Sequence, residues 1–223
     1  MGCGLRLGPF AFSRLAGGDL ELTIETVATG WQQVLSLFSD SSVSRIATRH
    51  GISFDVPGLT LRLANVNDLT SPVGYLYPEL IKDYRDRLFG DQRSKSMFYQ
   101  RMRRWDSGVG PPTDQLTGIE DLLKEDPNSR SAVFSTWLPH DDLGGEYPVS
   151  PVGGCFRLIA GVLYEFVIAR SVDVWVGLVP ELLTFAQLGR DMALTLGAQN
   201  CTLVYHSWSA HLYEIDYLSY VAR

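Results

Sequence analysis

The sequence contains little cysteine and no apolar stretch long enough to cross a bilayer. Its 223 residues include three cysteines, Cys3, Cys155 and Cys201, which are far apart and form no CxxC pair. Zinc sites draw on clustered cysteine and histidine, so we expect no metal site, and a sparse, odd cysteine count is typical of a reducing compartment. The first residues also lack the pattern of a signal peptide. We therefore expect a cytoplasmic protein without a membrane partner.

Basic residues are outnumbered as well. The chain has 19 lysines and arginines against 25 aspartates and glutamates, a formal net charge of -6. Proteins that bind double-stranded nucleic acid need a basic field to attract the phosphate backbone, so that class of partner is excluded. A small anionic ligand is compatible with the composition, because two or three local arginines suffice to bind one.

Apolar periodicity predicts a single α+β domain over residues 1–223. Hydrophobic residues make up 45% of the chain, enough for a sizeable core at this length. Helices are predicted over 30–38, 75–89, 113–124 and 178–196, and a strand is predicted to run into a helix over 20–28. Strands are predicted over 59–64, 132–137, 155–159, 162–168 and 202–206, with a tight hairpin at Ala160-Gly161. Thr113 is expected to cap the third helix.

Three motifs follow one another in the second half of the chain. They are Asp114-Gln115-Leu116 with Asp126-Pro127-Asn128-Ser129-Arg130 and Trp137-Leu138-Pro139, then Arg170-Ser171-Val172-Asp173, and finally Ser209-Ala210-His211-Leu212-Tyr213. Each motif alone is weak, but the ordered set with its gaps resembles thymidylate synthases and the related deoxynucleotide hydroxymethylases. The resemblance covers about residues 114–216, and a looser likeness to short archaeal-type members reaches back through residues 98–101.

This resemblance implies a fold, a substrate class and a cofactor. The fold would be α+β, a large bent mixed β-sheet with helices on one face, and two subunits would join through their sheets as a homodimer. The substrate would be a pyrimidine nucleoside monophosphate in a pocket shared across the interface. The reaction would transfer a one-carbon unit, methyl or hydroxymethyl, from 5,10-methylenetetrahydrofolate to C5 of dUMP or of a ribo- or deoxycytidylate.

Two arginines are the candidates for binding the phosphate. Arg170 and Ser171 follow an apolar strand, and their N–H and O–H donors suit a phosphate, the role that the resemblance gives them. By the same resemblance, Arg130 would reach the phosphate of the neighbouring subunit, although Ser131 replaces a second family arginine. From the residues alone, Arg170 could instead pair with Asp173, and Arg130 could be an exposed arginine at a strand edge. The family's N-terminal arginine loop is not recognisable in this sequence.

His211 and Tyr213 are two residues apart, so they share one face of an extended chain. The resemblance assigns both side chains to the sugar 3′-hydroxyl, while a buried, hydrogen-bonded histidine is the alternative. His206 and Trp208 precede them and are expected at the floor of the pocket.

Two acidic residues are candidates for contacts with the base. Asp173 matches the family aspartate that lies between folate and base. Glu181 stands where the family usually carries an asparagine that binds the edge of uracil. A carboxylate offers only acceptors, so an ionised Glu181 would repel O4 of uracil and suit the amino group of cytosine, and cytidylate-specific relatives carry an acid here. The alternative is that Glu181 stabilises the first turn of the helix after Pro180.

The cysteine nucleophile of the family is missing. The family spacing counts back twenty residues from Arg170 and reaches Ser150, whereas Cys155 lies fifteen residues before Arg170. Serine is a poor nucleophile without an adjacent base, and Pro151 replaces the histidine that usually follows the family cysteine. Cys155 also fits a buried strand position. Ser150 and Cys155 are therefore alternative candidates for the attacking residue.

Three functional interpretations follow. The retained binding residues favour an enzyme, a C1-transferase acting on a pyrimidine nucleotide. The lost cysteine favours a non-catalytic family member, either a nucleotide sensor or the inactive subunit of a heterodimer. The third is reuse of the pocket for another reaction on a modified nucleotide. Because the chain ends at Arg223, we also expect it to lack the segment that closes over folate in many members.

Overall fold

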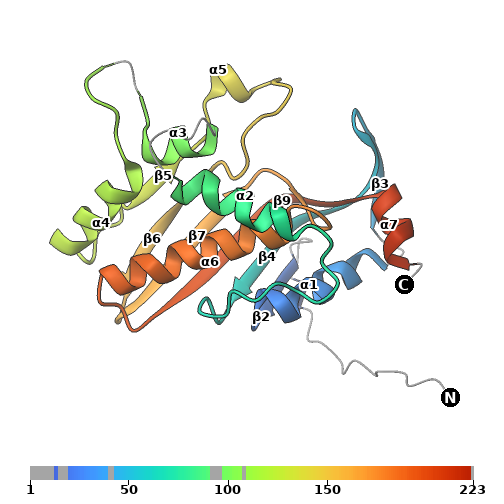
Figure 1. Ribbon diagram of the computed structural model, residues 1–223, viewed down its shortest axis with the longest axis horizontal. Helices are drawn as coiled ribbons and strands as arrows, with labels where there is room; N and C mark the ends of the chain where they lie inside the picture. Colours follow the sequence, from blue (N-terminus) through green and yellow to red (C-terminus); the bar gives the residue numbers. More distant parts are fainter. Residues whose placement is uncertain (1–12, 15–19, 40–42, 91–96, 107–108, 222–223) are drawn as a thin grey trace.

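A computed structural model describes residues 13–14, 20–39, 43–90, 97–106 and 109–221, and a mixed β-sheet lies at its centre (Figure 1). Within these residues the sheet has nine strands in the order β1-β2-β4-β9-β7-β6-β5, with β3 paired to β4 and β8 paired to β9. The strands are β1 (Ser13–Arg14), β2 (Leu20–Ile24), β3 (Ser44–Thr48), β4 (Gly51–Leu63), β5 (Val133–Ser135), β6 (Gly153–Ile159), β7 (Val162–Ala169), β8 (Val172–Asp173) and β9 (Asn200–Tyr213). The helices are α1 (Val27–Ser36), η1 (Leu37–Ser39, a 3-10 turn), α2 (Pro78–Phe89), α3 (Met97–Arg103), α4 (Gln115–Glu125), α5 (Pro139–Asp142), α6 (Leu178–Thr195) and α7 (Glu214–Val221).

Two long antiparallel strands, β4 and β9, form the middle of the sheet. Ser53 lies opposite Tyr213 at one end of the pair, and Leu63 lies opposite Leu203 at the other. On the outer sides, β2 runs parallel to β4 and β7 runs parallel to β9, while β7, β6 and β5 pair antiparallel. Strands from both halves of the chain thus join in one sheet, which confirms the predicted α+β class with a large mixed sheet.

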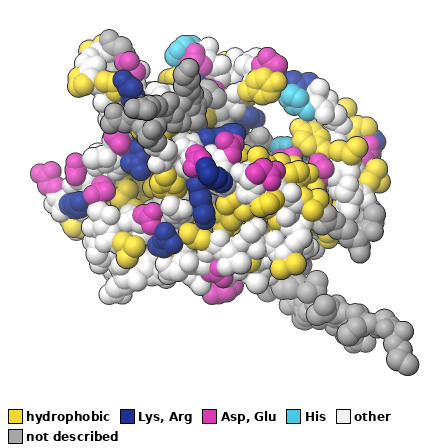
Figure 2. All heavy atoms as spheres, in the orientation of Figure 1, with side chains coloured by type: hydrophobic (Ala, Val, Ile, Leu, Met, Phe, Trp, Pro, Cys, Tyr) yellow, Lys and Arg dark blue, Asp and Glu magenta, His cyan; other side chains and the backbone are white. Residues whose placement is uncertain are grey.

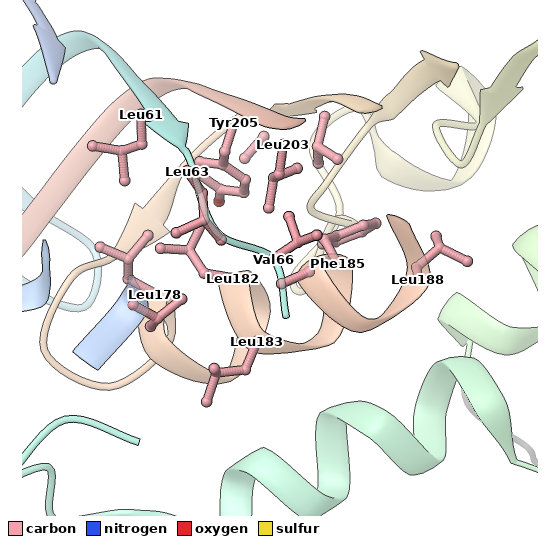
Figure 3. Packing of buried hydrophobic residues seen from close by; sticks show 14 of the residues in the cluster. Leu61, Leu63, Val66, Leu178, Leu182, Leu183, Phe185, Leu188, Leu203 and Tyr205 are labelled. Carbon is pink, nitrogen blue, oxygen red and sulfur yellow. The ribbon is translucent and has the colours of Figure 1, made fainter. Parts of the chain in front are cut away.

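Helix α6 covers one face of this sheet and forms the main core with it. Leu178, Leu182 and Phe185 lie over the side chains that β4 and β9 present to the helix (Figure 3). Those strand side chains are Leu61, Leu63, Leu203 and Tyr205 (Figure 3). Burial of this apolar surface, at about 25 cal/mol per Å², supplies the main stabilisation of the layer.

Helix α2 lies over α6 as an outer layer (Figure 1). It begins at Pro78, where proline occupies the first helical turn, rather than at the predicted Tyr75. Its outer face carries the ion pairs Lys82–Asp86 and Asp83–Arg87, and basic and acidic side chains lie side by side over this helix in Figure 2. The helix therefore presents an apolar side to α6 and a charged side to solvent.

Several predicted elements needed correction. The predicted strand over 59–64 is the end of β4, which starts at Gly51 and forms a hairpin with the unpredicted β3. The predicted strand over 202–206 is the middle of β9, and α5 and α7 were not predicted. Asp114, not Thr113, caps α4, because its carboxylate accepts the N–H groups of Leu116 and Thr117. The hairpin at Ala160-Gly161 is confirmed, with positive φ at both residues.

A buried carboxyl group lies between β7 and α6. Glu165 is fully buried, and neither of its carboxylate oxygens has a hydrogen-bond partner among the described residues. Burial raises the pKa of this carboxyl well above its usual range. Gly189 of α6 makes the arrangement possible, since a Cβ at that position would lie 2.3 Å from Glu165 Oε2 and 2.6 Å from Cys201 Sγ.

We expect the substitution Glu165→Gln to stabilise the protein increasingly as the pH rises from 5 to 8. Unfolded chains lose the glutamate proton near its ordinary pKa, while the folded protein retains it, so wild-type stability falls with rising pH by up to about 1.4 kcal/mol per unit. Glutamine removes this linkage. Urea unfolding at both pH values measures the effect, with Glu125→Gln, an exposed acid at the end of α4, as the matched control. An unchanged stability difference between pH 5 and 8 would contradict the assignment of a neutral, buried Glu165.

No helix in the part of the chain that the structure describes is long and apolar enough to span a membrane.

Candidate functional site

Two cavities lie next to each other and share a wall, and the first of them lies at one end of β4 and β9. The first, here called the arginine cavity, has a volume of about 450 Å³, and the second, the aromatic cavity, about 460 Å³. Tyr147 and Pro148, from the segment between α5 and β6, line both. A ligand that extends from one cavity to the other must therefore pass this segment.

The arginine cavity collects side chains from five parts of the chain. They come from the β3–β4 hairpin, from β4, from the segment between α5 and β6, from the end of β7 and from β9. Its lining residues are Thr48, Arg49, His50, Ser53, Asp55, Glu146, Tyr147, Pro148, Arg170, Ser171, Ser209, His211 and Tyr213. Four of the predicted site residues, Arg170, Ser171, His211 and Tyr213, are thus brought together here.

Arg170 connects this cavity to the shared wall. Its Nε donates to the carbonyl of Val149 at 3.1 Å, Nη2 to that of Pro148 at 2.7 Å, and Nη1 to Ser171 Oγ at 2.9 Å. These bonds use three of the five guanidinium N–H groups, which leaves two for an anion. Among the described residues, Arg170 makes no ion pair with Asp173. The alternative in which these two residues form a surface ion pair therefore does not apply.

Arg49 is a second cation of this cavity that sequence reasoning missed. It lies in the turn between β3 and β4, and its Nη2 donates to the carbonyls of Gly145 at 3.2 Å and Glu146 at 2.5 Å. Arg49 and Arg170 therefore hold the shared wall from its two ends. The signal available in the sequence was the alternation of apolar and polar residues over 52–56, directly after Arg49-His50-Gly51.

The aromatic cavity lies on the other side of the shared wall, between α2, α3 and α6. Its lining residues are Tyr84, Arg87, Phe98, Tyr147, Pro148, Val149, Ser150, Pro151, Glu181, Thr184 and Phe185. Flat aromatic faces with one arginine and one acid can hold a planar ring system that carries polar edges.

Glu181 is buried at the floor of the aromatic cavity. Its Oε2 accepts a hydrogen bond from the Tyr205 hydroxyl oxygen at 2.8 Å, and Oε1 has no hydrogen-bond partner among the described residues. Burial raises the pKa of the carboxyl to about 7, while the Tyr205 hydroxyl and the charge of Arg170 oppose that rise. The pKa of nearby Tyr84 is raised to about 12, chiefly by burial and then by Glu181. The carboxyl faces Tyr205 and the cavity, so it does not cap its own helix.

Ser150 follows the shared wall in the chain, one residue after Val149, whose carbonyl accepts a hydrogen bond from Arg170. Its Oγ donates to the carbonyl of Ser171 at 2.9 Å, and it lines the aromatic cavity together with Glu181. The preceding Val149 is held from both sides, because its N–H donates to Asp142 Oδ1 at 2.9 Å and its carbonyl accepts Arg170 Nε. The hydroxyl of Ser150 is thereby held at the lining of the aromatic cavity.

Asp142 is the buried anchor of this arrangement. Its other oxygen, Oδ2, accepts the N–H of Leu138 at 2.7 Å and a hydrogen bond from Arg101, which also donates to Thr136 O at 2.7 Å. Burial would raise the pKa of Asp142, but the N–H groups of Val149 and Leu138, together with Arg101, lower it below its usual value. A charge-paired carboxylate at this position fixes the start of the shared wall.

The family model for thymidylate synthase matches residues 82–220, well over half of the chain, and this stretch contains Ser150, Arg170 and Glu181. The chain belongs to the thymidylate synthase family. The resemblance noted in the sequence is thus confirmed, and the fold is thymidylate synthase-like. The match begins in α2, so the β3–β4 hairpin with Arg49 lies outside it.

Relatives of this thymidylate synthase family member come from archaea and bacteria. A protein of Methanothermobacter marburgensis named "Putative thymidylate synthase" is 25% identical over 215 residues, covering 88% of this chain and 94% of its own length. The protein of the same name from Methanothermobacter thermautotrophicus is 27% identical over 159 residues, 70% of each chain. The thymidylate synthase of Listeria monocytogenes is 26% identical over 119 residues, covering 53% of this chain and 38% of its own length.

Cys155, the second candidate for the thymidylate synthase nucleophile, lies elsewhere. It pairs with Val133 and Phe166 in the sheet, whereas Phe156 and Glu165 point to the α6 side. Successive strand residues alternate between faces, so Cys155 points away from both cavities. It is half-buried rather than buried, and burial raises the pKa of its thiol, against the effect of Arg157. Of the two candidates, only Ser150 is brought to the cavities.

Four other predicted positions lie apart from the cavity linings of this thymidylate synthase family member. Asp173 Oδ1 accepts the N–H groups of Trp175 and Val176, and burial raises the pKa of the carboxyl. Arg130 is exposed before β5 and contributes to neither cavity of its own chain. His206 and Trp208 face the other side of the sheet, so their prediction as pocket floor was wrong: His206 bonds Thr60, and Trp208 is 55% exposed.

Within the described residues, no group of three or more histidine, cysteine, aspartate or glutamate side chains could hold a metal ion. Cys155 and Cys201 are free thiols, and Cys3 lies outside the described residues.

Proposed function

We propose that the protein binds a pyrimidine nucleoside monophosphate across the two cavities. The phosphate would lie on Arg49, Arg170 and Ser171, and the sugar against His211 and Tyr213. One observation carries this proposal: the arginine cavity and the aromatic cavity, which has Glu181 at its floor, meet at a single wall. A nucleotide has this polarity, with an anion at one end and a hydrogen-bonding ring at the other.

The base would reach over the shared wall to Ser150 and Glu181. Glu181 Oε1 has no partner among the described residues, so it is available to the ring edge. The ionised acid accepts the amino group of cytosine, whereas the neutral acid can donate to O4 of uracil. With a pKa of about 7, both the ionised and the neutral form of Glu181 are populated at neutral pH.

We expect the preference for cytidylate over uridylate to increase by at least about tenfold between pH 6 and 8. Glu181 loses its proton across this range, which gains an acceptor for cytosine and loses a donor for uracil. Because ionisation of the nucleotide phosphate affects both ligands alike, it cancels in the ratio of the two dissociation constants. Calorimetric titrations at both pH values measure that ratio, and Glu181→Gln should make it independent of pH. A wild-type ratio that does not change with pH would contradict this role of Glu181.

We further propose that the protein transfers a one-carbon unit to C5 of the base, with 5,10-methylenetetrahydrofolate as the donor. The aromatic cavity fits such a cofactor, because Phe98, Phe185 and Tyr84 offer ring faces. Arg87, which also pairs with Asp83, lines the same cavity and is a cation for a carboxylate tail. When bound, the folate would supply the one-carbon unit. The residues of this chain would orient the nucleotide, and Ser150 would lie next to C6 of the base.

We propose a homodimer that forms through the sheet face opposite α6. A row of cross-strand partners on that face consists of Val133, Cys155, Phe166 and Val204, and Val133 is 56% exposed. Such apolar rows are stable when covered by another sheet. The exposed Arg130 would then be free to reach the arginine cavity of the partner, the role that the family resemblance gives it.

One observation favours a second candidate, a non-catalytic nucleotide-binding member that acts as a sensor or partner subunit. The Ser150 hydroxyl donates to the backbone carbonyl of Ser171. Among the described residues, no side chain that could act as a general base is hydrogen-bonded to it. An alcohol without a base is a weak nucleophile. Turnover of any nucleotide with methylenetetrahydrofolate by the purified protein alone would exclude this candidate.

Calorimetric titration tests the binding proposal. CMP, dCMP, UMP and dUMP are each titrated into the purified protein, with thermal unfolding as a second readout. We expect a binding heat and a raised melting temperature with at least one of the four. If none of them produces heat or a thermal shift, the binding proposal is wrong.

A further inference from the structure

The arginine cavity contains an acid whose position has no role in the binding scheme above. Asp55 is half-buried in β4, where its Cα partner across the strand pair is His211. Its Oδ2 accepts a hydrogen bond from Ser209 Oγ at 2.6 Å. Its Oδ1 accepts no hydrogen bond from the described residues, and no ion pair joins it to Arg49 or Arg170 among them.

A carboxylate in a cavity of this kind restricts the ligand. Carboxylate oxygens only accept hydrogen bonds, and they repel a phosphate. The ligand must therefore carry its anion at the end with Arg49 and Arg170 and present O–H or N–H donors to Asp55. A sugar phosphate has this arrangement, since its hydroxyl groups are donors on the opposite side of the ring from the phosphate ester.

The number of hydroxyl groups then matters. The proposed function, on which this step rests, places one sugar hydroxyl against His211 and Tyr213. In this scheme the 3′-hydroxyl accepts a hydrogen bond from Tyr213 and donates its single proton to the acceptor nitrogen of His211, so a 2′-deoxynucleoside 5′-monophosphate has no further O–H for Asp55. A ribonucleotide has two neighbouring hydroxyls, so the second can donate to Asp55 Oδ1.

We propose that Asp55 accepts a hydrogen bond from the second hydroxyl of a ribose, so that the protein selects ribonucleoside over deoxyribonucleoside monophosphates. A site with a buried hydrogen-bonding group discriminates against a ligand that lacks the matching group, because its own polar atom is then left without a partner. For a charged acceptor that is half-buried, the selection amounts to about 10- to 100-fold in affinity.

The test is a set of paired titrations, CMP against dCMP and UMP against dUMP, with the ratio of dissociation constants as the readout. Wild-type protein should bind each ribonucleotide about 10- to 100-fold more tightly than its deoxy counterpart. Asp55→Asn, which keeps the size and removes the charge, should reduce this ratio, and Asp55→Ala should bring it to about one. A purely structural role for Asp55 would weaken both ligands equally and leave the ratio unchanged.

Two variants serve as controls. Glu146→Gln removes an acid from the same cavity lining, so it should change both affinities by one factor and preserve the ratio. Ser209→Ala removes the strand-to-strand hydrogen bond but keeps the acceptor, so the ratio should persist. If deoxynucleotides bind wild-type protein as tightly as ribonucleotides, the inference is wrong while the proposed function stands. If none of the four binds, both are wrong.

Discussion

Replacing Arg170 by alanine lowers the affinity for a nucleoside monophosphate by about 100-fold or more. The substitution removes the two N–H groups that remain for the phosphate and also the three hydrogen bonds that hold Pro148, Val149 and Ser171. Both losses act in the same direction, because the shared wall then leaves its position between the cavities. Titration with the tightest-binding nucleotide measures the effect.

Two further variants separate these contributions. Arg170→Lys retains the charge but lacks the forked donors, so it should recover only a small part of the affinity. Arg45→Ala removes an exposed arginine that pairs with Glu214 at the surface, and it should leave binding unchanged. Wild-type affinity in Arg170→Ala would show that the ligand binds elsewhere.

Restoring a thiol at position 150 should raise the rate of one-carbon transfer. We expect Ser150→Cys to increase turnover by about 100-fold or more, which corresponds to a barrier lower by about 2.7 kcal/mol. A thiol at this position is ionised more easily than a serine hydroxyl, and the thiolate is the better nucleophile. Transfer of label from methylenetetrahydrofolate to the nucleotide measures the rate.

Cys155→Ser is the matched control for this experiment. Because Cys155 lies on the sheet face away from the cavities, its loss should leave turnover unchanged in both the wild-type and the Ser150→Cys backgrounds. Loss of activity in Cys155→Ser, with no gain in Ser150→Cys, would reverse the assignment of the attacking position.

The elements that the sequence predicted well are those whose pattern is local. Helix α6 is an apolar run followed by Gly197 at positive φ, and the hairpin after Ile159 follows from Ala160-Gly161. The hairpin with Arg49 was missed because β3 is fully exposed and carries no apolar alternation strong enough to identify it. The early part of β4 was missed because Pro57 and Gly58 interrupt the strand pattern.

The site could be predicted only where motif residues carry it. Arg170, Ser171, His211 and Tyr213 were found as motif members, and the cavity unites them. Arg49 and Asp55 are more than a hundred residues from that group in the sequence and reach it only through the pairing of β4 with β9. The contacts of a single side chain are likewise invisible in the sequence. Spacing alone left Ser150 and Cys155 as alternatives. Strand alternation then placed Cys155 on the face away from the cavities, while Ser150 lines the aromatic cavity.

A crystal structure of the protein with a bound nucleoside monophosphate tests the central claim most directly. We predict a phosphate held by Arg49 and Arg170 in the arginine cavity, and a pyrimidine ring over the shared wall with C6 next to Ser150 Oγ and its edge at Glu181. A nucleotide bound outside these two cavities, or one whose C6 lies against Cys155, would contradict the account.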